Sequence, residues 1–505
     1  MGPRIKAWAA LGALFALLLA FKLWLSNSFP VTGDEAYFIV WGLRPDWGYY
    51  DHPPMVGWLL ALLSRISMSA WVLRLPVVLL PAIVSVGMYL ALKSKDRQKA
   101  LYASLAFLLL PINVWNVFIT TDTPLVFFCF FSGLAWWRAR EESSAAWYSA
   151  AGVLLGLAFL SKYFAVLLAL VYLADTVLAP RSTRPWRGLA LTYTASLPFV
   201  LLNLWWNYGH CWANVMFNLY NRQEDARFSL VTVLLFVLIT AYTLSPVALA
   251  QMTRRGWREN LGAGPGAGFF LLACGLPFAL FALLSFVRSV GLHWVLGFVP
   301  FFFMAAALTL KAEQLKTSVK YLGLFSLLHV AVIIAATALP LESWKSSHLY
   351  DGLVFHFRIH DVVNAMKAHE PEFALAADGY SPAVTASYYA GSYVFVFGTA
   401  SSHARHDDLI TDFRSYAGKN ILVFRKTRPE QDEYRPFFRS VQVQTMELSG
   451  ATLYLVLGRG FNYPAYRDRV LTAVRDRFYS IPKLLPQGGC VFCERYFGSY
   501  CPTRS

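Results

Sequence analysis

Long apolar runs alternate with short polar connections over the first two thirds of the chain. A helix that crosses about 30 Å of hydrocarbon needs roughly 17 to 25 residues, and many of the runs approach or reach that length. They lie near residues 7–25, 71–92, 100–119, 123–137, 146–160, 163–179, 189–206, 229–250, 267–287, 293–310 and 320–339. The pattern predicts about eleven membrane-spanning helices. The three runs between 123 and 179 are short, and the pair around Ser161-Lys162 is alternatively one broken span or a re-entrant pair.

The composition agrees with a membrane protein. Of the 505 residues, 57% are hydrophobic and only 14% are charged, and the mean hydropathy is +0.46. A soluble protein is far more charged than this. The net charge of +15 would suit nucleic acid, but Lys and Arg gather in short loops between apolar runs, which is a signal of membrane topology. The bilayer is therefore the predicted partner, and nucleic acid is not.

Basic residues fall mainly on alternate connections. Because cytoplasmic loops carry the excess of Lys and Arg, the N-terminus is predicted to be cytoplasmic and the loop over 26–70 to face outward. One side collects Arg4, Lys6, Lys93, Lys95, Arg97, Lys99, Arg138, Arg140, Arg181, Arg184, Arg187, Arg254, Arg255, Arg258, Lys311, Lys316 and Lys320. The other side has Arg44, Arg65, Lys162, Arg222, Arg227 and Arg288. The first apolar run is expected to be retained, because it is long and lacks a small-x-small cleavage site before Asn27.

The chain changes character near residue 340, where it gains charge and turn residues and loses long apolar runs. Short strands are predicted at 373–377, 393–397, 420–424 and 452–457, with helices near 358–369 and 382–390. We therefore predict a membrane domain over 1–340 and a soluble α/β domain over 341–505. An odd number of spans places this second domain on the outer, periplasmic side.

Four polar clusters lie on the predicted outer side of the membrane. Ionisable groups are costly against a bilayer, so their convergence on one face predicts a functional site. The clusters are Asp34-Glu35-Ala36-Tyr37 with Gly48-Tyr49-Tyr50-Asp51-His52-Pro53-Pro54, Thr120-Thr121-Asp122-Thr123-Pro124, Ser161-Lys162-Tyr163, and Arg288 to Trp294 with His293.

Each cluster also has a structural interpretation. Asp34-Glu35 suits a solvated pair or a helix cap, and Asp122 before Thr-Pro is a good N-cap pattern. Lys162 and Arg288 suit interfacial snorkelling, and His293-Trp294 suits an aromatic belt. The coincidence of all four on one side favours a function. Carboxylates beside cations at a membrane surface suit a reaction of a lipid-linked phosphate, in which a carboxylate deprotonates an acceptor hydroxyl and cations stabilise the departing phosphate.

Taken together, the motifs resemble the bacterial branch of the dolichyl-phosphate-mannose protein mannosyltransferase superfamily. This branch includes the aminoarabinose and galacturonic acid transferases of lipid A and lipopolysaccharide core. The motifs span about residues 1 to 310, and the hydropathy layout extends the match to about 340. The resemblance implies a GT-C fold, a polyprenyl-phosphate sugar donor and inversion at the anomeric carbon.

The resemblance also implies roles for single residues. Asp34 matches the catalytic base, Glu35 its acidic neighbour, and Asp122 the acid of the second loop. Relatives often have lysine before proline where this chain has His52. The residues predicted to bind the donor phosphate are His52, Lys162, Arg288 and His293. No cofactor is implied with certainty, and a divalent metal ion held by Asp51, Asp34 and Asp122 stays open.

The six cysteines form two groups. Cys129, Cys211 and Cys274 lie in or beside apolar segments, whereas Cys490, Cys493 and Cys501 lie near the C-terminus. A zinc knuckle would need a fourth ligand, and none stands at the usual spacing. A disulfide with one thiol left over is favoured in an oxidising compartment.

The leading hypothesis is an inner-membrane glycosyltransferase that moves one sugar to a hydroxyl or phosphate of lipid A, lipopolysaccharide core or another glycolipid. A protein O-glycosyltransferase is an alternative acceptor class. A transporter or lipid flippase would place ionisable residues near the bilayer midplane rather than at the outer ends of spans. An oligosaccharyltransferase or polymer ligase would share the lipid donor and transfer a glycan chain.

Overall fold

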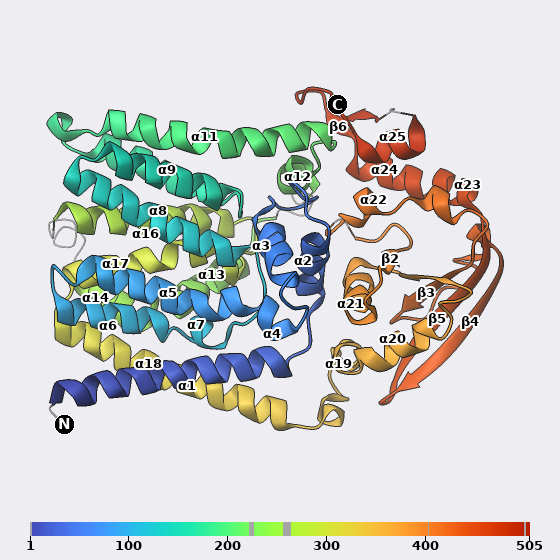
Figure 1. The fold of residues 1–505 in the computed structure, drawn as a ribbon, viewed down its shortest axis with the longest axis horizontal. Helices are drawn as coiled ribbons and strands as arrows, with labels where there is room; N and C mark the ends of the chain where they lie inside the picture. The colour runs from blue at the N-terminus through green and yellow to red at the C-terminus, as the bar shows by residue number, and fades with distance from the viewer. Residues whose placement is uncertain (1–2, 222–226, 256–263, 402, 499–500, 505) are drawn as a thin grey trace. The chain divides into compact units, whose positions relative to one another are not determined.

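The structure is a computed structural model that describes residues 3–221, 227–255, 264–401, 403–498 and 501–504 (Figure 1). The chain divides into two compact units, each assembled from three segments. Unit 1 comprises residues 1–29, 69–201 and 226–336, and unit 2 comprises 30–68, 202–225 and 337–505. The basic residues Arg222 and Arg258, which the topology prediction used, lie outside the described residues.

The described part of unit 1 is helical. Helix α8 packs against α9 and η3, and α17 packs against α16 and α6. The elements are α1 (Pro3–Ser28), α4 (Ala70–Leu73), α5 (Leu75–Leu92), α6 (Arg97–Leu108), α7 (Pro111–Trp115), α8 (Asp122–Glu142), α9 (Ala145–Phe159), α10 (Ala165–Leu178), η1 (Arg181–Thr183), α11 (Trp186–Gly209), α13 (Leu230–Leu244), α14 (Pro246–Arg255), α16 (Pro265–Ser285), η3 (Leu292–Phe298), α17 (Val299–Thr309) and α18 (Ala312–Ala338). The last residues of α11 and α18 belong to unit 2.

Each predicted span contains at least one helix, so the polytopic, mainly helical prediction is confirmed. Five described helices are long and apolar enough to cross a membrane, or up to seven if each of two bent helix pairs is one span. One such pair is α13 and α14, which meet at an angle of 91° at the junction of Ser245 and Pro246. The number of eleven crossings stays a prediction.

The predicted span over 100–119 is wrong as a single helix. Pro111 has no N–H to offer the carbonyl of Phe107 one turn earlier, and the Asn113 side chain donates to that carbonyl instead, at 2.7 Å. Helix α7 then ends at Trp115. A proline and two asparagines within six residues thus interrupt an otherwise apolar run.

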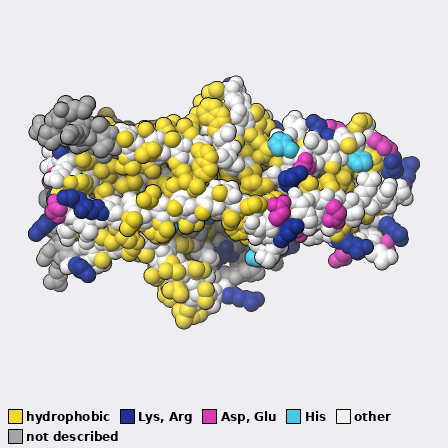
Figure 2. Space-filling model, turned by 90° about the horizontal axis from the view of Figure 1, so that it is seen from below, with side chains coloured by type: hydrophobic (Ala, Val, Ile, Leu, Met, Phe, Trp, Pro, Cys, Tyr) yellow, Lys and Arg dark blue, Asp and Glu magenta, His cyan; other side chains and the backbone are white. Residues whose placement is uncertain are grey.

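Hydrophobic side chains dominate the visible surface of the helical part of the chain (Figure 2). Helix α18, for example, exposes Leu324, Leu327, Leu328 and Val332. Exposed apolar side chains in such number along a helix suit contact with lipid rather than water.

Unit 2 is built around a five-stranded sheet of order β2-β1-β3-β5-β4. Strand β1 is parallel to both β2 and β3, whereas β5 is antiparallel to both of its neighbours. The strands are β1 (Ala374–Ala377), β2 (Phe395–Val396), β3 (Ile421–Arg425), β4 (Phe438–Leu448) and β5 (Ala451–Phe461), with a separate pair β6 (Ile481–Pro482) and β7 (Thr503–Arg504).

Alternate side chains of the central strands enter two different cores. Ile421 and Val423 belong to one cluster, and Leu422 and Phe424 to the other, because successive side chains of a strand point to opposite faces. Helices contribute to both clusters. The helical elements of unit 2 are α2 (Gly33–Leu43), α3 (Met55–Ser64), α12 (Ala213–Met216), η2 (Phe217–Asn221), η4 (Leu341–Trp344), α19 (Tyr350–Phe357), α20 (Ile359–Lys367), α21 (Tyr380–Ala390), α22 (Asp407–Ile410), η5 (Phe413–Tyr416), η6 (Arg435–Phe437), α23 (Tyr463–Tyr466), η7 (Arg467–Leu471), α24 (Thr472–Phe478) and α25 (Val491–Phe497).

The predicted C-terminal α/β fold is confirmed, with strand β4 of the sheet and the short strands β6 and β7 missed. Strand β4 pairs only with β5 and exposes much of its length. Its sequence alternates apolar and polar residues over Val441-Gln442-Val443-Gln444, a pattern that the prediction, which relied on continuous apolar runs, did not use. Ser449 and Gly450 connect the two strands with φ angles of 50° and 82°. Two positive φ angles are those of a type I′ hairpin turn, which glycine favours.

The predicted domain division at residue 340 stays a prediction, while each compact unit gathers segments from several parts of the chain. Residues 30–68 and the described residues of 202–221 belong to the same compact unit as the C-terminal part. The first predicted outer loop is therefore part of the same compact unit as the sheet.

Candidate active site

The acidic pair of the first outer loop opens helix α2. Thr32 is the N-cap, and its Oγ1 accepts a hydrogen bond from the Glu35 amide at 3.4 Å. Glu35 Oε2 in turn accepts one from the Thr32 amide at 3.1 Å. This reciprocal pair is a capping box, which satisfies two N–H groups at the start of a helix. Glu35 is fully buried, so its carboxylate fixes the beginning of α2.

Asp34 precedes Glu35 and is exposed. The hydroxyl of Tyr380, the first residue of α21, donates a hydrogen bond to Asp34 Oδ1 at 3.0 Å. Burial and, second, the Asp34 charge raise the pKa of the Tyr380 phenol, so Tyr380 stays a donor at neutral pH. Among the described residues, the other Asp34 oxygen has no hydrogen-bond partner. Asp34 thus presents one fixed and one available carboxylate oxygen.

Asp51 lies in the same unit and is buried. The Tyr37 hydroxyl donates to Asp51 Oδ1 at 2.8 Å and accepts from the His406 amide at 3.2 Å. The Tyr50 amide donates to His406 Nδ1 at 3.4 Å. Burial, followed by the charges of His210 and Arg44, lowers the pKa of His406 to about 3, so its ring is neutral and able to accept. This network ties the first loop to the C-terminal segment.

Asparagine side chains of a second segment hold the same loop. Asn214 Nδ2 donates to the Tyr49 carbonyl at 3.0 Å, and Asn218 Nδ2 donates to the Asp51 carbonyl at 3.1 Å. The two asparagines are four residues apart on α12 and η2, so they share one helical face. They fix the backbone on both sides of Tyr50.

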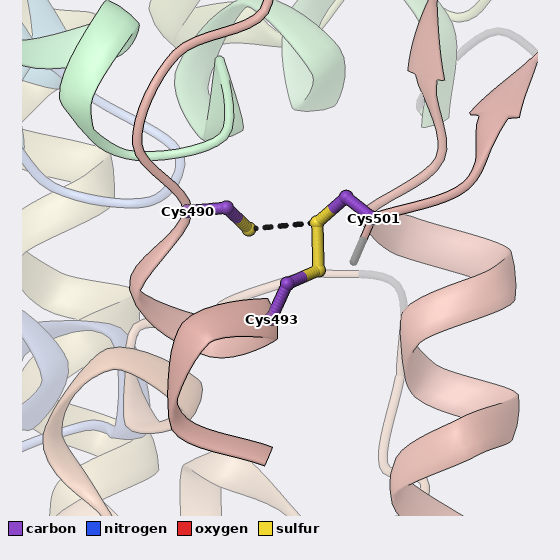
Figure 3. A group of neighbouring side chains, drawn as sticks. All are labelled: Cys490, Cys493 and Cys501. Carbon is purple, nitrogen blue, oxygen red and sulfur yellow. Dashed lines mark hydrogen bonds between the residues drawn. A yellow bond between two sulfur atoms is a disulfide. The ribbon is translucent and has the colours of Figure 1, made fainter. Parts of the chain in front are cut away.

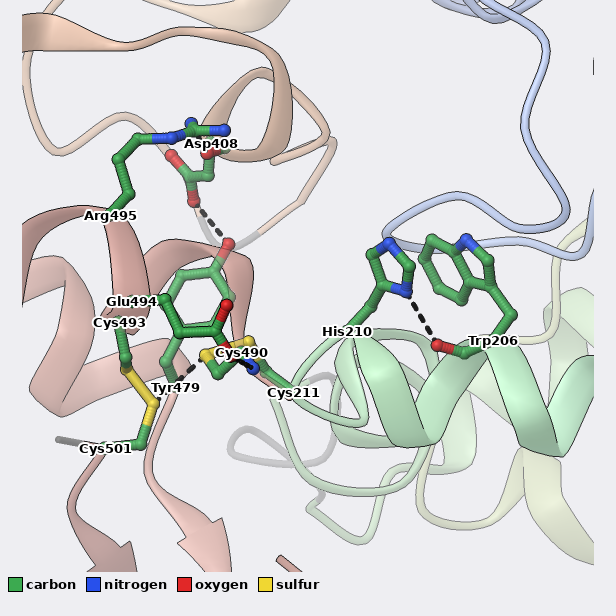
Figure 4. The surroundings of a disulfide bond; sticks show 10 residues. All are labelled: Trp206, His210, Cys211, Asp408, Tyr479, Cys490, Cys493, Glu494, Arg495 and Cys501. Carbon is green, nitrogen blue, oxygen red and sulfur yellow. Dashed lines mark hydrogen bonds between the residues drawn. A yellow bond between two sulfur atoms is a disulfide. The ribbon is translucent and has the colours of Figure 1, made fainter. Parts of the chain in front are cut away.

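A disulfide between Cys211 and Cys490 anchors the start of this segment. Beside it, the Trp212 indole donates to the Pro486 carbonyl at 2.9 Å, and the Cys211 amide donates to the Gly489 carbonyl at the same distance. Figure 4 shows the surroundings, in which the Tyr479 hydroxyl donates to Asp408 Oδ2 at 2.8 Å. The C-terminal tail is therefore joined covalently to the segment that carries the two asparagines.

The C-terminal cysteines are oxidised rather than arranged as a zinc knuckle. Cys493 and Cys501 form a second disulfide, and Cys501 Sγ lies 3.0 Å from Cys490 Sγ (Figure 3). The disulfide interpretation is confirmed, but the expected leftover thiol is wrong, because Cys490 pairs with Cys211 far away in sequence. Metal binding needs thiolates, which these disulfides do not offer. Among the described residues, this is the one group of three or more acid, His or Cys side chains close enough to share a metal ion.

Asp122 and Lys162, both in unit 1, form a buried ion pair. Lys162 Nζ donates to Asp122 Oδ1 at 2.8 Å and to Oδ2 at 2.9 Å. The Lys162 side chain is only 8% exposed and the Asp122 side chain only 4%. Asp122 begins α8 and Lys162 lies in the turn between α9 and α10, so the pair joins two segments that sequence reasoning had assigned separate roles.

The other predicted phosphate-binding residues are less enclosed. Arg288 follows α16, is half-buried, and has a buried Nε without a hydrogen-bond partner among the described residues. His293 is exposed in η3. His52, in unit 2, is half-buried with its ring near those of Phe38 and Trp41. Arg288 is thus the cation with an evident spare donor.

Sequence reasoning assigned no role of their own to Lys22, Tyr37 and Tyr380, which contact or neighbour the predicted acids. Lys22 is 4% exposed in α1 and lines a cavity of unit 1 together with Asp122. A lone lysine near the end of the first apolar run was the available signal. Tyr37 stood in the acidic motif of the first loop, but the importance of both tyrosines comes from the carboxylates that they contact.

Each unit by itself offers groups suited to acid-base chemistry or to anion binding. Unit 2 offers an exposed carboxylate fixed by a phenol, and unit 1 offers a buried ion pair and an arginine with a spare N–H. A divalent-ion site formed by Asp34, Asp51 and Asp122 stays a prediction, as do the assigned catalytic roles.

Comparison with known proteins agrees with the predicted resemblance. The sequence profile of the dolichyl-phosphate-mannose-protein mannosyltransferase family matches residues 51–206. The lipid A galacturonosyltransferase RgtD of Rhizobium johnstonii is 28% identical over 203 residues, which are 38% of this chain and 43% of the relative. The match therefore spans less than half the length of this curated relative.

Solved structures share the fold. ArnT from Cupriavidus metallidurans in the apo state superposes with a TM-score of 0.63 at 16% identity, covering 89% of this chain and 98% of ArnT. The same protein bound to undecaprenyl phosphate gives a TM-score of 0.58 at 15% identity with the same coverage. The predicted GT-C fold is confirmed, and the predicted family resemblance is confirmed for the matched segment.

Proposed function

We propose that this protein is a glycosyltransferase that moves one sugar from a polyprenyl-phosphate donor to an acceptor at the periplasmic face of the inner membrane. The exposed Asp34 carboxylate, fixed at the start of α2 by Tyr380, carries the proposal. The family match over 51–206, the similarity to a lipid A galacturonosyltransferase and the ArnT fold support the reaction class.

Asp34 acts as the general base in this proposal. Its available oxygen takes the proton of an acceptor hydroxyl, whose oxygen attacks the anomeric carbon and displaces the lipid phosphate with inversion. Tyr380 holds the other oxygen at 3.0 Å, so the carboxylate is oriented before the substrate arrives. A positioned base of this kind contributes about 10²- to 10⁴-fold to rate. Glu35 supports the base by fixing the helix start, and its carboxylate has no separate catalytic task.

The departing phosphate is stabilised by cations. Arg288 is the leading candidate because its Nε is buried and has no hydrogen-bond partner among the described residues, and guanidinium groups bind phosphate well. His52 and His293 supply further donors. Lys162 is already paired with Asp122, so it contributes by holding that acid in place or by exchanging partners when donor binds.

The acceptor in this proposal is a glycolipid of the bacterial inner membrane, with lipid A favoured by the name of the relative RgtD. The donor lipid is undecaprenyl phosphate or a similar polyprenyl phosphate, which is the ligand bound to ArnT in its solved complex. The active site and the C-terminal domain face the periplasm. A protein acceptor is the alternative within the same reaction class.

A transporter is the second candidate function, and Lys22 is the observation that favours it. Ionisable residues inside helices are expected on transport pathways, and Lys22 is buried within α1. The two functions are separated by product: a transporter moves lipid between leaflets without forming a glycosidic bond.

The test is sugar transfer in membranes that contain the full chain, a labelled polyprenyl-phosphate sugar and lipid A. Asp34→Asn should lower kcat by at least about 100-fold without changing expression, because the amide cannot accept the proton. Asp46→Asn is the matched control in the same loop and should behave as wild type. Turnover by Asp34→Asn close to wild type would reject the base assignment. Lipid movement without any transfer product from the wild type would favour the transporter.

A further inference from the structure

Lys22 is a cation inside the membrane unit with no carboxylate beside it. Its side chain is 4% exposed, and Nζ donates to the Val77 carbonyl at 3.2 Å and the Asn113 carbonyl at 3.0 Å. Among the described residues, no Asp or Glu lies within ion-pair distance of Lys22. Burial without a counter-charge disfavours the protonated form of an amine, and an anionic group beside it offsets that cost.

Helix breaks account for the two contacts that Lys22 makes. Pro81 lacks the N–H that would bond the Val77 carbonyl one turn earlier in α5. Helix α7 ends at Trp115, so the Asn113 carbonyl has no helical donor four residues later. Lys22 satisfies both carbonyls, but any residue with two N–H donors could do so. Neutral carbonyls explain the hydrogen bonds and supply no counter-charge.

The Lys22 side chain borders a cavity of about 40 Å³. Polar residues Asn116, Thr120 and Asp122 line the same cavity. Asp122 does not balance Lys22, because both of its oxygens accept hydrogen bonds from Lys162. The volume is enough for about three water-sized groups, so the oxygens of a carboxylate or the non-bridging oxygens of an esterified phosphate fit. The cavity thus combines a buried amine without a counter-charge, polar walls and room for a small anionic group.

We propose that Lys22 and this cavity bind an anionic oxygen group, a phosphate or a carboxylate, that belongs to the sugar donor. The inference rests on the proposed function for the identity of that ligand. An ammonium has three N–H groups, of which two are engaged by the carbonyls, so one remains for the ligand. The phosphate would come from the lipid carrier, and the carboxylate from a uronic sugar.

The experiment measures binding of undecaprenyl phosphate to the purified full chain in lipid nanodiscs. It also compares transfer from two donors on the same lipid, one carrying galacturonate and one carrying galactose. Lys22→Gln keeps N–H donors for the carbonyls and removes the charge, whereas Lys22→Arg keeps the charge. Lys320→Gln, which changes an exposed lysine of unit 1, is the matched control.

Lys22→Gln should lower the affinity for the anionic ligand by about 10- to 100-fold, as loss of a hydrogen bond to a charged group does. Lys22→Arg should recover most of the affinity. If the group is the phosphate, binding of undecaprenyl phosphate and transfer from both donors should fall alike. If it is the sugar carboxylate, only transfer from the galacturonosyl donor should fall. Either pattern supports the inference.

A second variant protects the test against misfolding of Lys22→Gln. Thr120→Leu narrows the cavity and leaves Lys22 in place, and it should weaken the same ligand. Folded variants that bind undecaprenyl phosphate and transfer both sugars as well as the wild type would overturn the inference. Failure of the wild type to transfer either sugar would reject the proposed function instead, while Lys22-dependent binding of undecaprenyl phosphate would still support the anion site.

Discussion

The hydroxyl of Tyr380 donates a hydrogen bond to Asp34 Oδ1 at 3.0 Å across a sequence separation of 346 residues. The proposed base therefore depends on a side chain from the C-terminal part of the chain. The rings of Tyr37 and Tyr380 meet edge to face with centroids 5.7 Å apart, so the phenol is held by packing as well as by its hydrogen bond. The C-terminal domain is part of the proposed catalytic apparatus rather than an appendage.

Tyr380→Phe should lower kcat about 10-fold and change the donor KM by less than about 2-fold, because it removes one hydrogen bond of roughly 1.5 to 3 kcal/mol to a charged group. The ring packing is kept, so stability should change little. Steady-state transfer kinetics with the labelled donor provide the measurement.

Tyr388→Phe is the matched control for Tyr380. It lies on the same helix, and its hydroxyl donates to the Met68 carbonyl at 2.7 Å rather than to an acid. Its kcat should equal that of wild type. Equal kcat for both variants would show that the contact with Asp34 has no bearing on catalysis.

The Asp122–Lys162 pair should behave as a coupled unit in folding. Asp122→Asn or Lys162→Met alone leaves a buried charge without its partner, which costs about 3 to 5 kcal/mol. The double variant removes both charges and should recover most of the lost Tm. Thermal unfolding of the four proteins forms a double-mutant cycle.

Transfer assays on the same four proteins separate a structural from a chemical role. Recovery of Tm without recovery of transfer in the double variant would assign the pair a task beyond folding. Single variants with the Tm of wild type would contradict a buried ion pair.

Much of the fold could be predicted because membrane-spanning helices and buried strands both appear in the sequence as apolar runs of characteristic length. Apolar runs long enough to cross a membrane located each helical region, and β1, β3 and β5 stood out as apolar runs buried on both faces. The broken helix at Pro111 and the exposed edge strand β4 escaped the prediction. One proline changes a helix inside an unaltered apolar pattern, and β4 alternates apolar with polar residues instead of forming a continuous apolar run.

The candidate site was predictable in its acids and not in its contacts. Asp34 and Asp122 stood out as charges at membrane boundaries. Their partners come from segments distant in sequence: Tyr380 for Asp34 and Lys162 for Asp122. Long-range pairing leaves no trace in local patterns, which is also why Cys211 was not matched with Cys490.

The Cys211–Cys490 disulfide should matter more than Cys493–Cys501. The first closes a loop with a sequence separation of 279 residues and the second one of 8. By restricting the unfolded chain, the disulfide of the long loop raises the free energy of unfolding by about 5 to 6 kcal/mol and that of the short loop by about 2.5 kcal/mol. The paired substitution Cys211→Ser with Cys490→Ser should therefore lower Tm more than Cys493→Ser with Cys501→Ser.

Loss of the long-range disulfide should also reduce transfer, since it anchors the segment in which Asn214 and Asn218 bond the Tyr49 and Asp51 carbonyls. Asn218→Leu, with both disulfides intact, should reproduce part of that loss. Full transfer activity in the Cys211→Ser and Cys490→Ser variant would separate the disulfide from the geometry of the loop.

Asp407 should make the stability of the C-terminal domain fall as pH rises. Burial is the main cause that raises the pKa of this carboxyl from 3.8 to about 7, and the Tyr393 hydroxyl donates to it. Because the folded pKa lies above the unfolded one, the contribution to stability is fully present below pH 3.8 and is lost as pH rises through about 7. Asp407→Asn lacks this penalty, so its Tm advantage over wild type should grow between pH 5 and pH 8, by the equivalent of about 2.5 kcal/mol.

Tyr393→Phe tests the same carboxyl in the opposite direction. The Tyr393 hydrogen bond stabilises the charged form of Asp407 and opposes the rise in its pKa, so its loss should lower Tm more at pH 8 than at pH 5. Thermal unfolding at both pH values in the same nanodiscs measures the two variants against wild type. A Tm difference between Asp407→Asn and wild type that is equal at pH 5 and pH 8 would mean that Asp407 titrates alike in the folded and unfolded states, contrary to its burial.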